Sequence, residues 1–309
     1  MGHDGFMVGA ARLPGVTVRA VPSAAVRAVA VLGTGVVDAE AAVLGADDLG
    51  LTRGDGCFEA TRVWTGVDGE HRVDHLEPHL DRFGASCAAL QLPAPDRAGW
   101  RELIGQLLAG WTEPGEAMLK LMLSRGRESQ PDGPVTGIAT LAPVTARVLR
   151  QREGISALTL GRGTSSDAYA DAPWLLGGVK SLSYAVNVAA IRVAQQRGAD
   201  DVIFTSSDGF VLEAPTAAVL WFAGGRLLTT PTGGTGILAS ITQQALFTEA
   251  ERDGVRTGYA LGTVEELHAA DGVWLASSGR GVAPVHTLDG RPLRIPAEFS
   301  ARLAALAGF

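Results

Sequence analysis

The segment Gly178-Val179-Lys180-Ser181-Leu182-Ser183-Tyr184-Ala185-Val186-Asn187 stands out because lysine is rare in this chain. Of the 26 Lys and Arg residues, only Lys120 and Lys180 are lysine. Arginine can carry surface charge but stays protonated, whereas a lysine amine can lose its proton and form an imine. Small and apolar residues precede Lys180, and burial among them would lower the pKa of its amine. Lys180 is therefore a candidate nucleophile, with an ordinary surface lysine between strand and helix as the alternative.

The composition is that of a folded protein large enough for two domains. The chain has 309 residues, of which 46% are hydrophobic, and this is ample for sizeable cores. The net charge is -7 and basic residues form no run, which argues against a nucleic-acid partner because Lys and Arg must neutralise phosphates. The sequence shows neither a signal-peptide pattern nor an apolar span of membrane length. We therefore expect a cytoplasmic protein without a membrane partner.

The cysteines and histidines do not predict a metal centre. Cys57 and Cys87 lie in apolar sequence without C-x-x-C spacing, which favours buried reduced thiols over a disulfide. His71, His75 and His79 recur at every fourth residue, and this spacing invites a zinc interpretation. No cysteine and no H-E-x-x-H motif supports it. We expect no bound metal.

The first half predicts strands mixed with two helices. A glycine-flanked turn at Gly54 leads into a β-rich segment, and Asp68-Gly69 predicts a hairpin. Apolar spacing and turn residues predict strands over 57–65, 71–73, 118–123 and 138–141, and helices over about 74–90 and 98–111. The polar segment 145–154 is typical of an interdomain connection. We place the boundary near residue 150, which gives an N-terminal domain of residues 1–150 and a C-terminal domain of residues 151–309.

The second half shows a different alternation of strands and helices. Ser207-Asp208-Gly209 and Gly224-Gly225 predict hairpin turns. The expected strands cover 155–160, 202–205, 210–213, 219–223, 226–230, 273–276 and 285–290. A helix should follow the Lys180 segment and end at Arg197-Gly198, where glycine supplies the stop. Glu213 falls at the end of an apolar strand.

A glycine-rich segment over residues 232–240 precedes a predicted helix. Ser240 and Gln243 have capping-box spacing, so the helix should begin at Ile241. The free amides of a helix start, together with the helix dipole, can receive a phosphate. No lysine follows the glycines, which excludes a Walker loop, and the spacing does not fit a dinucleotide fingerprint. An ordinary helix start is the alternative to an anion site.

One chemistry uses all of these parts, namely pyridoxal phosphate catalysis. It needs a lysine that forms an imine, a carboxylate that keeps the pyridine nitrogen protonated, and helix amides that hold the phosphate. Lys180, Glu213 and the helix start at Ile241 supply them. Arg82 on a predicted helix is a candidate anion ligand, with a solvated helix face as the alternative. Ser278 is not part of a G-x-S-x-G elbow, so a serine hydrolase is not expected.

The order and the residues of these motifs resemble those of the class IV aminotransferases of fold type IV. This family includes branched-chain and D-amino acid aminotransferases and 4-amino-4-deoxychorismate lyase. The resemblance runs from Gly54-Asp55-Gly56-Cys57-Phe58-Glu59 to Asp289-Gly290. It implies a two-domain fold of α/β and α+β character, in which a barrel-like sheet with helices forms the C-terminal, cofactor-binding domain. It also implies pyridoxal 5'-phosphate between the domains, and a homodimer.

The resemblance further implies roles for individual residues. Lys180 in K-S-L-S-Y matches the Schiff-base lysine, Glu213 in V-L-E-A-P-T the acid at the pyridine nitrogen, and Arg82 in H-L-D-R-F the phosphate arginine. The other implied cofactor-binding residues are Tyr184, Ile241, Thr242 and Ser278. The family usually has glycine in place of Ser240 and arginine in place of Gln243, so the surroundings of the phosphate should differ in detail.

Three short segments indicate the substrate. Gly54-Asp55-Gly56-Cys57-Phe58 and Ser124-Arg125-Gly126 look most like aminodeoxychorismate lyases, and Gln130-Pro131-Asp132-Gly133 replaces the R-x-H carboxylate trap of D-amino acid aminotransferases. We therefore expect a lyase of folate biosynthesis that forms 4-aminobenzoate and pyruvate from an amine substrate, 4-amino-4-deoxychorismate. Transamination of branched-chain or D-amino acids is the alternative.

The substrate carboxylates need cationic partners. Arg125 and Arg280 are the candidates, and a purely structural role is the alternative for each. A non-catalytic protein that keeps the fold is a further alternative. The presence of both Lys180 and Glu213 disfavours it.

Overall fold

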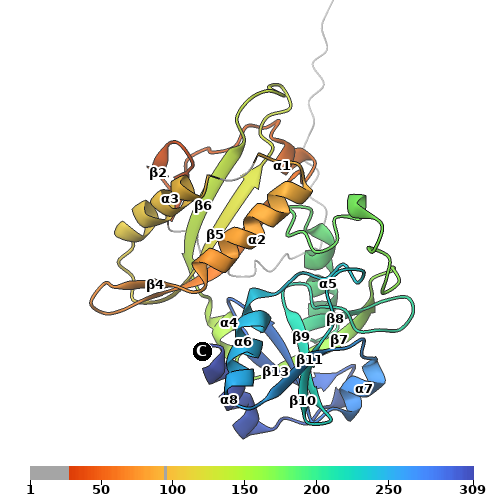
Figure 1. Ribbon diagram of the computed structural model, residues 1–309. Coiled ribbons are helices and arrows are strands. Elements are labelled where there is room, and N and C mark those ends of the chain that lie inside the picture. Colours follow the sequence, from red (N-terminus) through yellow and green to blue (C-terminus); the bar gives the residue numbers. More distant parts are fainter. Residues whose placement is uncertain (1–27, 94–95) are drawn as a thin grey trace, which may run out of the picture.

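Two β-sheets, each with its own helices, form the two lobes of the molecule (Figure 1). The computed structural model describes residues 28–93 and 96–309. The first sheet has six strands in the order β2-β1-β6-β5-β3-β4, and the second has eight, with β11-β10-β9-β12-β13-β7-β8 in a row and β14 beside β13. The two-domain fold with α and β elements is confirmed. The boundary near residue 150 stays a prediction.

The first sheet is antiparallel throughout. The elements of this lobe are β1 (Ala28–Val31), β2 (Gly35–Val37), α1 (Leu49–Thr52), β3 (Gly56–Thr65), β4 (His71–Val73), α2 (Leu76–Ala89), α3 (Arg97–Ala109), β5 (Gly115–Ser124) and β6 (Thr136–Pro143). The strands and helices predicted over this half are confirmed. The sequence of residues 16–50 also predicts short β-like pieces, and those before residue 28 lie outside the described residues.

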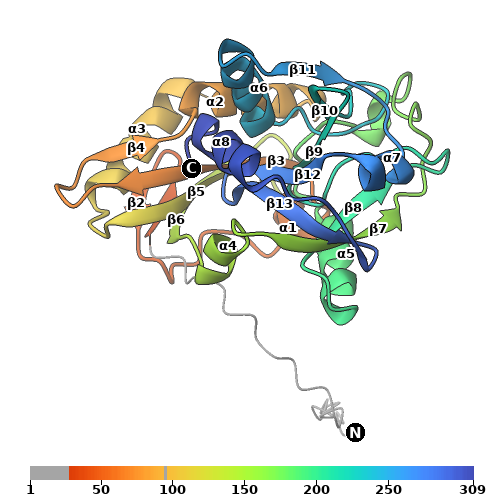
Figure 2. The same cartoon turned by 90° about the horizontal axis from the view of Figure 1, so that it is seen from below.

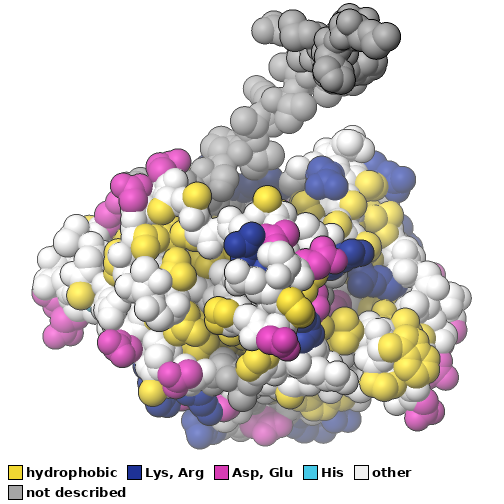
Figure 3. Space-filling view, turned by 90° about the horizontal axis from the view of Figure 1, so that it is seen from above, with side chains coloured by type: hydrophobic (Ala, Val, Ile, Leu, Met, Phe, Trp, Pro, Cys, Tyr) yellow, Lys and Arg dark blue, Asp and Glu magenta, His cyan; other side chains and the backbone are white. Residues whose placement is uncertain are grey.

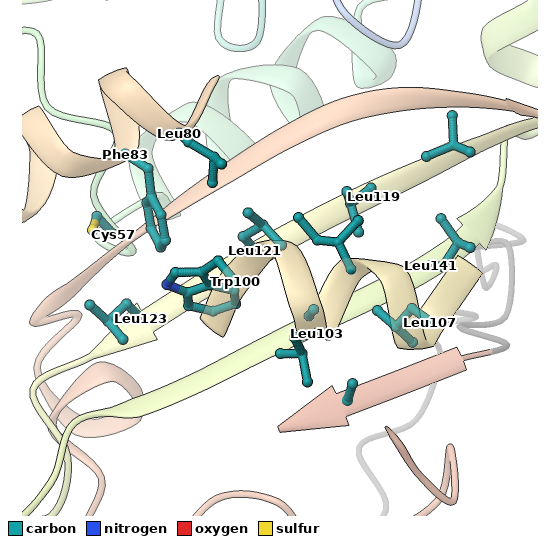
Figure 4. Packing of buried hydrophobic residues seen from close by; sticks show 14 of the residues in the cluster. Cys57, Leu80, Phe83, Trp100, Leu103, Leu107, Leu119, Leu121, Leu123 and Leu141 are labelled. Carbon is teal, nitrogen blue, oxygen red and sulfur yellow. The ribbon is translucent and has the colours of Figure 1, made fainter. Parts of the chain in front are cut away.

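One face of the first sheet is covered by α2 and α3 (Figure 4). Leu119, Leu121 and Leu123 alternate along β5 and point into this core, where Phe83 and Trp100 meet edge to face at 5.5 Å between ring centroids. Because successive side chains of a strand point to opposite faces, the residues between these leucines point to the uncovered face. That face is important for the site described below.

The second sheet mixes parallel and antiparallel pairs. Its β7 lies between β13 and β8 and is parallel to both, and β10 is parallel to β11. The elements are α4 (Ala146–Arg150), β7 (Ile155–Gly161), η1 (Pro173–Leu175), α5 (Ala185–Gln196), β8 (Asp201–Thr205), β9 (Ala218–Ala223), β10 (Arg226–Thr229), α6 (Ile241–Arg252), β11 (Arg256–Tyr259), α7 (Val264–Ala269), β12 (Gly272–Ser277), β13 (Gly281–Leu288), β14 (Arg291–Pro292) and α8 (Ala297–Leu306). Helices α6 and α8 lie side by side against β12 and β13 (Figure 2).

The Lys180 segment returns from the second lobe to the first. The Phe58 amide donates a hydrogen bond to the Lys180 carbonyl oxygen at 2.9 Å, and the Leu182 amide donates to the Gly56 carbonyl oxygen at 2.8 Å. The segment therefore pairs like a short strand with the start of β3 before α5 begins. This pairing fixes Lys180 at the junction of the two lobes.

Residues 210–213 were predicted as a strand, but they do not form a regular one. Only Phe210 and Val211 form isolated bridges, with Thr263 and Thr205 respectively. The Leu212 amide still donates to the Phe204 carbonyl oxygen at 2.8 Å. Pro215 lacks an amide hydrogen, so the chain cannot continue as a fully bonded strand there. Helix α8 was not predicted.

The described surface agrees with the acidic composition. The face in Figure 3 shows separate Lys and Arg side chains among acidic and hydrophobic ones, without a continuous basic area over its described residues. No helix within residues 28–93 and 96–309 has the length and apolar character needed to cross a membrane.

Candidate active site

Two aromatic rings frame the amine of Lys180. Its Nζ atom lies 4.4 Å from the centroid of the Phe58 ring and 5.7 Å from that of Tyr184. The two rings meet edge to face at 5.2 Å. Burial, assisted by the positive charge of Arg82, lowers the pKa of Lys180 to about 8. A substantial fraction of the amine is therefore unprotonated under mildly alkaline conditions, as nucleophilic attack requires.

Tyr184 is held by the chain that follows Glu213. Its hydroxyl donates a short hydrogen bond to the Pro215 carbonyl oxygen, which also accepts from Nδ2 of Asn187 at 2.8 Å. Burial raises the pKa of Tyr184 to about 12. The phenol therefore stays protonated, and its main effect on the site is to place its ring beside Lys180.

Glu213 carries a carboxyl group without a cationic hydrogen-bond partner among the described residues. Its Oε2 atom accepts from the Leu238 amide at 3.0 Å. Burial raises the pKa of Glu213 to about 7, against the opposing effects of that amide and of the Lys180 charge. A carboxyl group with this pKa can share a proton with a pyridine nitrogen of similar basicity. Glu213 thus suits the role predicted for it.

The start of α6 has the free donors of an anion site. Ser240 is the N-cap, and its Oγ accepts from the Gln243 amide at 3.3 Å, as predicted. The amides of Ile241 and Thr242 lie in the first turn, where a helix offers them no internal acceptor. The Thr242 hydroxyl lies 3.3 Å from that of Ser278 in the turn after β12. These amides and hydroxyls suit a phosphate group.

Arg82 reaches the same place from the first lobe. Its Nε and Nη2 atoms donate to the two carboxylate oxygens of Glu59, each at 2.7 Å, and Nη1 donates to the Ala239 carbonyl oxygen at 2.8 Å. The last bond joins α2 to the segment that leads into α6. It places the guanidinium next to the helix start, where it can add positive charge toward an anion.

Glu59 and His79 complete this arrangement, and the sequence analysis assigned neither a role. His79 Nδ1 lies 2.7 Å from Glu59 Oε2, and Nε2 lies 3.4 Å from the Ser278 hydroxyl. Burial lowers the pKa of His79, although Glu59 opposes this shift. Neutral His79 therefore donates from Nδ1 to Glu59 and can accept from Ser278 at Nε2. Burial would raise the pKa of Glu59, but its bonds to Arg82 and His79 outweigh burial and lower it.

The two departures from the family pattern lie at the start of α6, one at its N-cap and one in its first turn. Ser240 replaces a usual glycine and acts as the helix cap. Gln243 replaces a usual arginine, and its Nε2 is buried without a partner among the described residues. The phosphate side of the site therefore carries less positive charge than the family pattern implies.

The two arginines predicted to contact the substrate are both engaged elsewhere in the chain. Arg125 forms a salt bridge with Asp55 at 2.6 Å and donates to the Leu90 carbonyl oxygen at 2.7 Å, which ties it to the end of α2. Arg280 is buried and pairs with Asp201 at 2.7 Å, while its Nε and Nη2 have no partner in the described part of the chain. A structural role suits Arg125, and substrate contact by either arginine stays a prediction.

The residues present fit pyridoxal 5'-phosphate. The low pKa of Lys180 suits a bond to an aldehyde, the proton-sharing Glu213 suits a pyridine nitrogen, and the free amides of Ile241 and Thr242 suit a phosphate. Hydrogen bonds join the two lobes at this place, since His79 on α2 contacts Ser278, which follows β12, and Arg82 donates to the Ala239 carbonyl oxygen before α6. The arrangement is that of a pyridoxal-phosphate enzyme.

Comparison with known proteins gives the same class. The family model described as amino-transferase class IV matches residues 56–288. A bifunctional aminodeoxychorismate lyase / D-amino acid transaminase from Mycobacterium tuberculosis is 41% identical over 260 residues, which cover 81% of this chain and 88% of that protein. The chain belongs to the class IV aminotransferase family, and it is a pyridoxal-phosphate-dependent enzyme.

Solved structures of relatives support this assignment. A hypothetical aminotransferase from Mycobacterium tuberculosis in its PLP-bound form has 41% identity and a TM-score of 0.83, with 91% of this chain and 98% of that chain covered. The fold IV transaminase CpuTA1 from Curtobacterium pusillum has 40% identity and a TM-score of 0.84, with 91% and 99% covered.

Proposed function

We propose that this enzyme converts 4-amino-4-deoxychorismate to 4-aminobenzoate and pyruvate. The Lys180 amine, which is framed by Phe58 and Tyr184 and has its pKa lowered to about 8, can carry out the proton transfer that this reaction shares with transamination. The observation that carries the lyase itself is the absence of arginine and histidine from residues 128–134, after β5. The similarity to a bifunctional lyase and transaminase supports the choice of substrate.

The reaction begins with removal of one proton. When bound, pyridoxal phosphate supplies a ring that accepts the electron pair left behind. With the cofactor and substrate bound, Lys180 Nζ would remove the proton from the amine-bearing carbon. Glu213 would hold a proton at the pyridine nitrogen and so favour electron flow into the ring. The C–O bond to the enolpyruvyl group would then break, the departing enolpyruvate would take up a proton to become pyruvate, and aromatisation of the carbocycle would drive the elimination.

The segment after β5 favours the lyase over a D-amino acid transaminase. Residues 128–134 contain neither arginine nor histidine, so an R-x-H carboxylate trap has no counterpart there. Arg127, just before this segment, is paired with Asp47 at 2.8 Å. The loop therefore offers an amino acid carboxylate no unpaired arginine or histidine.

Transamination is the second candidate because the relative named above carries both activities in its name. It uses the same first proton transfer. Lys180 would then return the proton to the cofactor carbon instead of allowing the ether to leave, and a keto acid would be released. The residues around Lys180 serve either outcome.

A product assay distinguishes the two reactions. Purified enzyme loaded with pyridoxal phosphate is incubated with aminodeoxychorismate, and 4-aminobenzoate is quantified by chromatography while pyruvate is measured with lactate dehydrogenase. The lyase proposal requires the two products in equal amounts, with none formed by Lys180→Ala. Absence of 4-aminobenzoate, together with robust turnover of an amino acid and keto acid pair, would reject it.

We also propose that two copies of the chain form a homodimer. Large apolar side chains are exposed on both sides of the Lys180 segment, with Trp174 at 74% and Leu175 at 47% on η1, and Val186 at 58% on α5. Such exposure favours burial against a second protein surface. Light scattering during size-exclusion chromatography should give twice the chain mass, and a monomer at micromolar concentration would reject the proposal.

A further inference from the structure

The turn of residues 278–280 lies against the uncovered face of the first sheet. It joins β12 to β13 in the second lobe. Met118 on β5 is flanked by Ala117 and Leu119, which are buried in the core of the first lobe, so the Met118 side chain projects from the other face. A Cβ atom added at Gly279 would lie 3.1 Å from the Met118 sulfur. The two lobes therefore touch at this turn.

The guanidinium of Arg152 holds the backbone of the turn. Arg152 follows α4, where the chain passes from the first lobe to the second (Figure 1). Strand pairing ends at Ser277 and Gly281, so the three residues between them depend on other contacts for their place. Nη2 of Arg152 donates to the Gly279 carbonyl oxygen at 2.8 Å, and Nε donates to the Arg280 carbonyl oxygen at 3.2 Å. One side chain thus binds two of the three residues in the turn.

Glu116 on β5 holds this guanidinium from the first lobe. Its Oε1 and Oε2 atoms accept from Nη1 and Nη2 of Arg152 at 2.7 and 2.6 Å. A bidentate pair of this kind fixes the orientation of the guanidinium as well as its position. The hydrogen bonds from Arg152 also lower the pKa of Glu116, so the carboxylate stays charged at neutral pH. The Phe309 ring packs on the guanidinium, with its centroid 4.9 Å from Cζ of Arg152.

The side-chain contacts of Ser278 are too long to fix the turn by themselves. Its hydroxyl lies 3.3 Å from the Thr242 hydroxyl and 3.4 Å from Nε2 of His79. A hydroxyl that donates to an oxygen usually does so at about 2.5–3.0 Å. The 2.8 Å bond from Arg152 is shorter, and it connects the turn through Glu116 to the first lobe. The position of the Ser278 hydroxyl therefore depends on Arg152.

We propose that Arg152 is a positioning residue for the cofactor phosphate. By holding the carbonyl oxygens of Gly279 and Arg280, with Glu116 orienting its guanidinium, Arg152 sets the place of the Ser278 hydroxyl beside the start of α6. The amides of that helix start and the hydroxyl can then bind the same phosphate. The inference rests on the phosphate contact predicted for Ser278, and it is independent of whether the enzyme is a lyase or a transaminase.

The test compares the binding of pyridoxal phosphate with that of pyridoxal, which has the same ring and aldehyde but no phosphate. Absorbance titration of the apoenzyme measures both affinities, and circular dichroism verifies folding. Arg152→Met should weaken the affinity for pyridoxal phosphate roughly 5- to 50-fold, because the Ser278 hydroxyl no longer meets the charged phosphate. The affinity for pyridoxal should be unchanged. Arg152→Lys keeps a donor near Glu116 and should recover part of the loss.

A double variant separates positioning from a general contribution to stability. Ser278→Ala should by itself weaken the affinity for pyridoxal phosphate, because it removes the hydroxyl. In the Ser278→Ala background, Arg152→Met should cause less than a roughly 2-fold further loss, since a missing hydroxyl cannot be misplaced. Glu116→Gln leaves the Arg152 side chain in place but weakens its orientation. It should cause a smaller loss than Arg152→Met, and again only for the compound that carries the phosphate.

Arg302→Met is the matched control, because Arg302 also binds a carboxylate and a carbonyl oxygen, both of Asp253, and its side chain is 45% exposed. It should bind both compounds as wild type does. The proposal is overturned if Arg152→Met weakens both compounds equally, which would make Arg152 a brace between the lobes, or if the losses add in the double variant. Wild-type affinity for pyridoxal phosphate in Arg152→Met or in Ser278→Ala would also overturn it.

These measurements involve no turnover, so they are independent of the reaction catalysed. An enzyme that forms no 4-aminobenzoate but shows the phosphate-specific loss in Arg152→Met would reject the lyase and retain the positioning role. An enzyme that forms 4-aminobenzoate, but in which the losses from Arg152→Met and Ser278→Ala add, would retain the lyase and reject the positioning role.

Discussion

The Nζ atom of Lys180 lies 4.4 Å from the centroid of the Phe58 ring, although the two residues are 122 positions apart in the chain. Strand-like pairing between their backbones, with a hydrogen bond of 2.9 Å from the Phe58 amide to the Lys180 carbonyl oxygen, holds this contact in place. The reacting amine is thereby presented by one lobe and desolvated by the other.

Covalent capture of the cofactor should follow the pKa of Lys180. Only the neutral amine attacks an aldehyde, and the pKa of Lys180 is lowered to about 8. The rate at which apoenzyme takes up pyridoxal phosphate should rise with pH through about 8 and level off above it. Stopped-flow absorbance across the pH range measures this rate. A rate that keeps rising to pH 10 would mean that the amine is not desolvated.

Glu213→Gln should reduce turnover by roughly 10²- to 10⁴-fold, because glutamine cannot keep the pyridine nitrogen protonated. The variant should still bind pyridoxal phosphate, since Lys180 and the phosphate residues are unchanged. Single-turnover absorbance separates binding from proton removal. Full activity in Glu213→Gln would show that Glu213 is not needed to keep the pyridine nitrogen protonated.

The same substitution should change how the stability of the apoenzyme depends on pH. The pKa of Glu213 is raised from 4.5 to about 7 in the folded protein, so the folded state binds more protons than the unfolded state between these values. Relative to Glu213→Gln, the wild type should lose about 1–3 kcal/mol of stability as pH rises from 4.5 to 7.5. Urea unfolding at both pH values tests this loss, and parallel curves would contradict it.

Glu59→Gln should weaken the affinity for pyridoxal phosphate by roughly 10- to 100-fold, because removing one charged hydrogen-bond partner costs about 1.5–3 kcal/mol. Glu59 accepts two hydrogen bonds from Arg82 and orients His79 toward Ser278. Absorbance titration of the apoenzyme measures the affinity, with circular dichroism to verify folding. Glu128→Gln, at an exposed salt bridge with Arg53, is the control and should bind as wild type does. Equal affinity in both variants would refute the positioning role.

Sequence patterns predicted the parts of the site that depend on local structure. Ser240 caps α6 at the predicted residue because capping depends on neighbouring side chains and amides. The roles of Lys180 and Glu213 came from their motifs and from family resemblance. The structure adds the lowered pKa of Lys180, the raised pKa of Glu213 and their common location.

Other parts depend on contacts that sequence does not show. Glu59 and His79 are 20 positions apart on β3 and α2, and only the packing of this helix on the sheet brings them together. The salt bridge of Arg280 with Asp201 spans 79 positions, so its burial and pairing could not be foreseen.

The cysteines were expected as buried reduced thiols, and the structure confirms this with Cys57 and Cys87 free and their sulfur atoms 3.2 Å apart. The hydrogen bond between the two thiols, together with burial, raises the pKa of Cys57. Native enzyme should therefore react slowly with a thiol reagent, and both thiols should titrate after unfolding in guanidinium. Rapid modification of native enzyme would contradict their burial.

Identification of the residue that binds the cofactor tests the central claim most directly. Enzyme loaded with pyridoxal phosphate is reduced with borohydride and digested, and the labelled peptide is sequenced by mass spectrometry, with Lys180→Ala treated in parallel. The wild type should be yellow, should bleach on reduction and should carry one label on Lys180, while the variant should be colourless and unlabelled. A label on Lys120, or a labelled Lys180→Ala variant, would contradict the account.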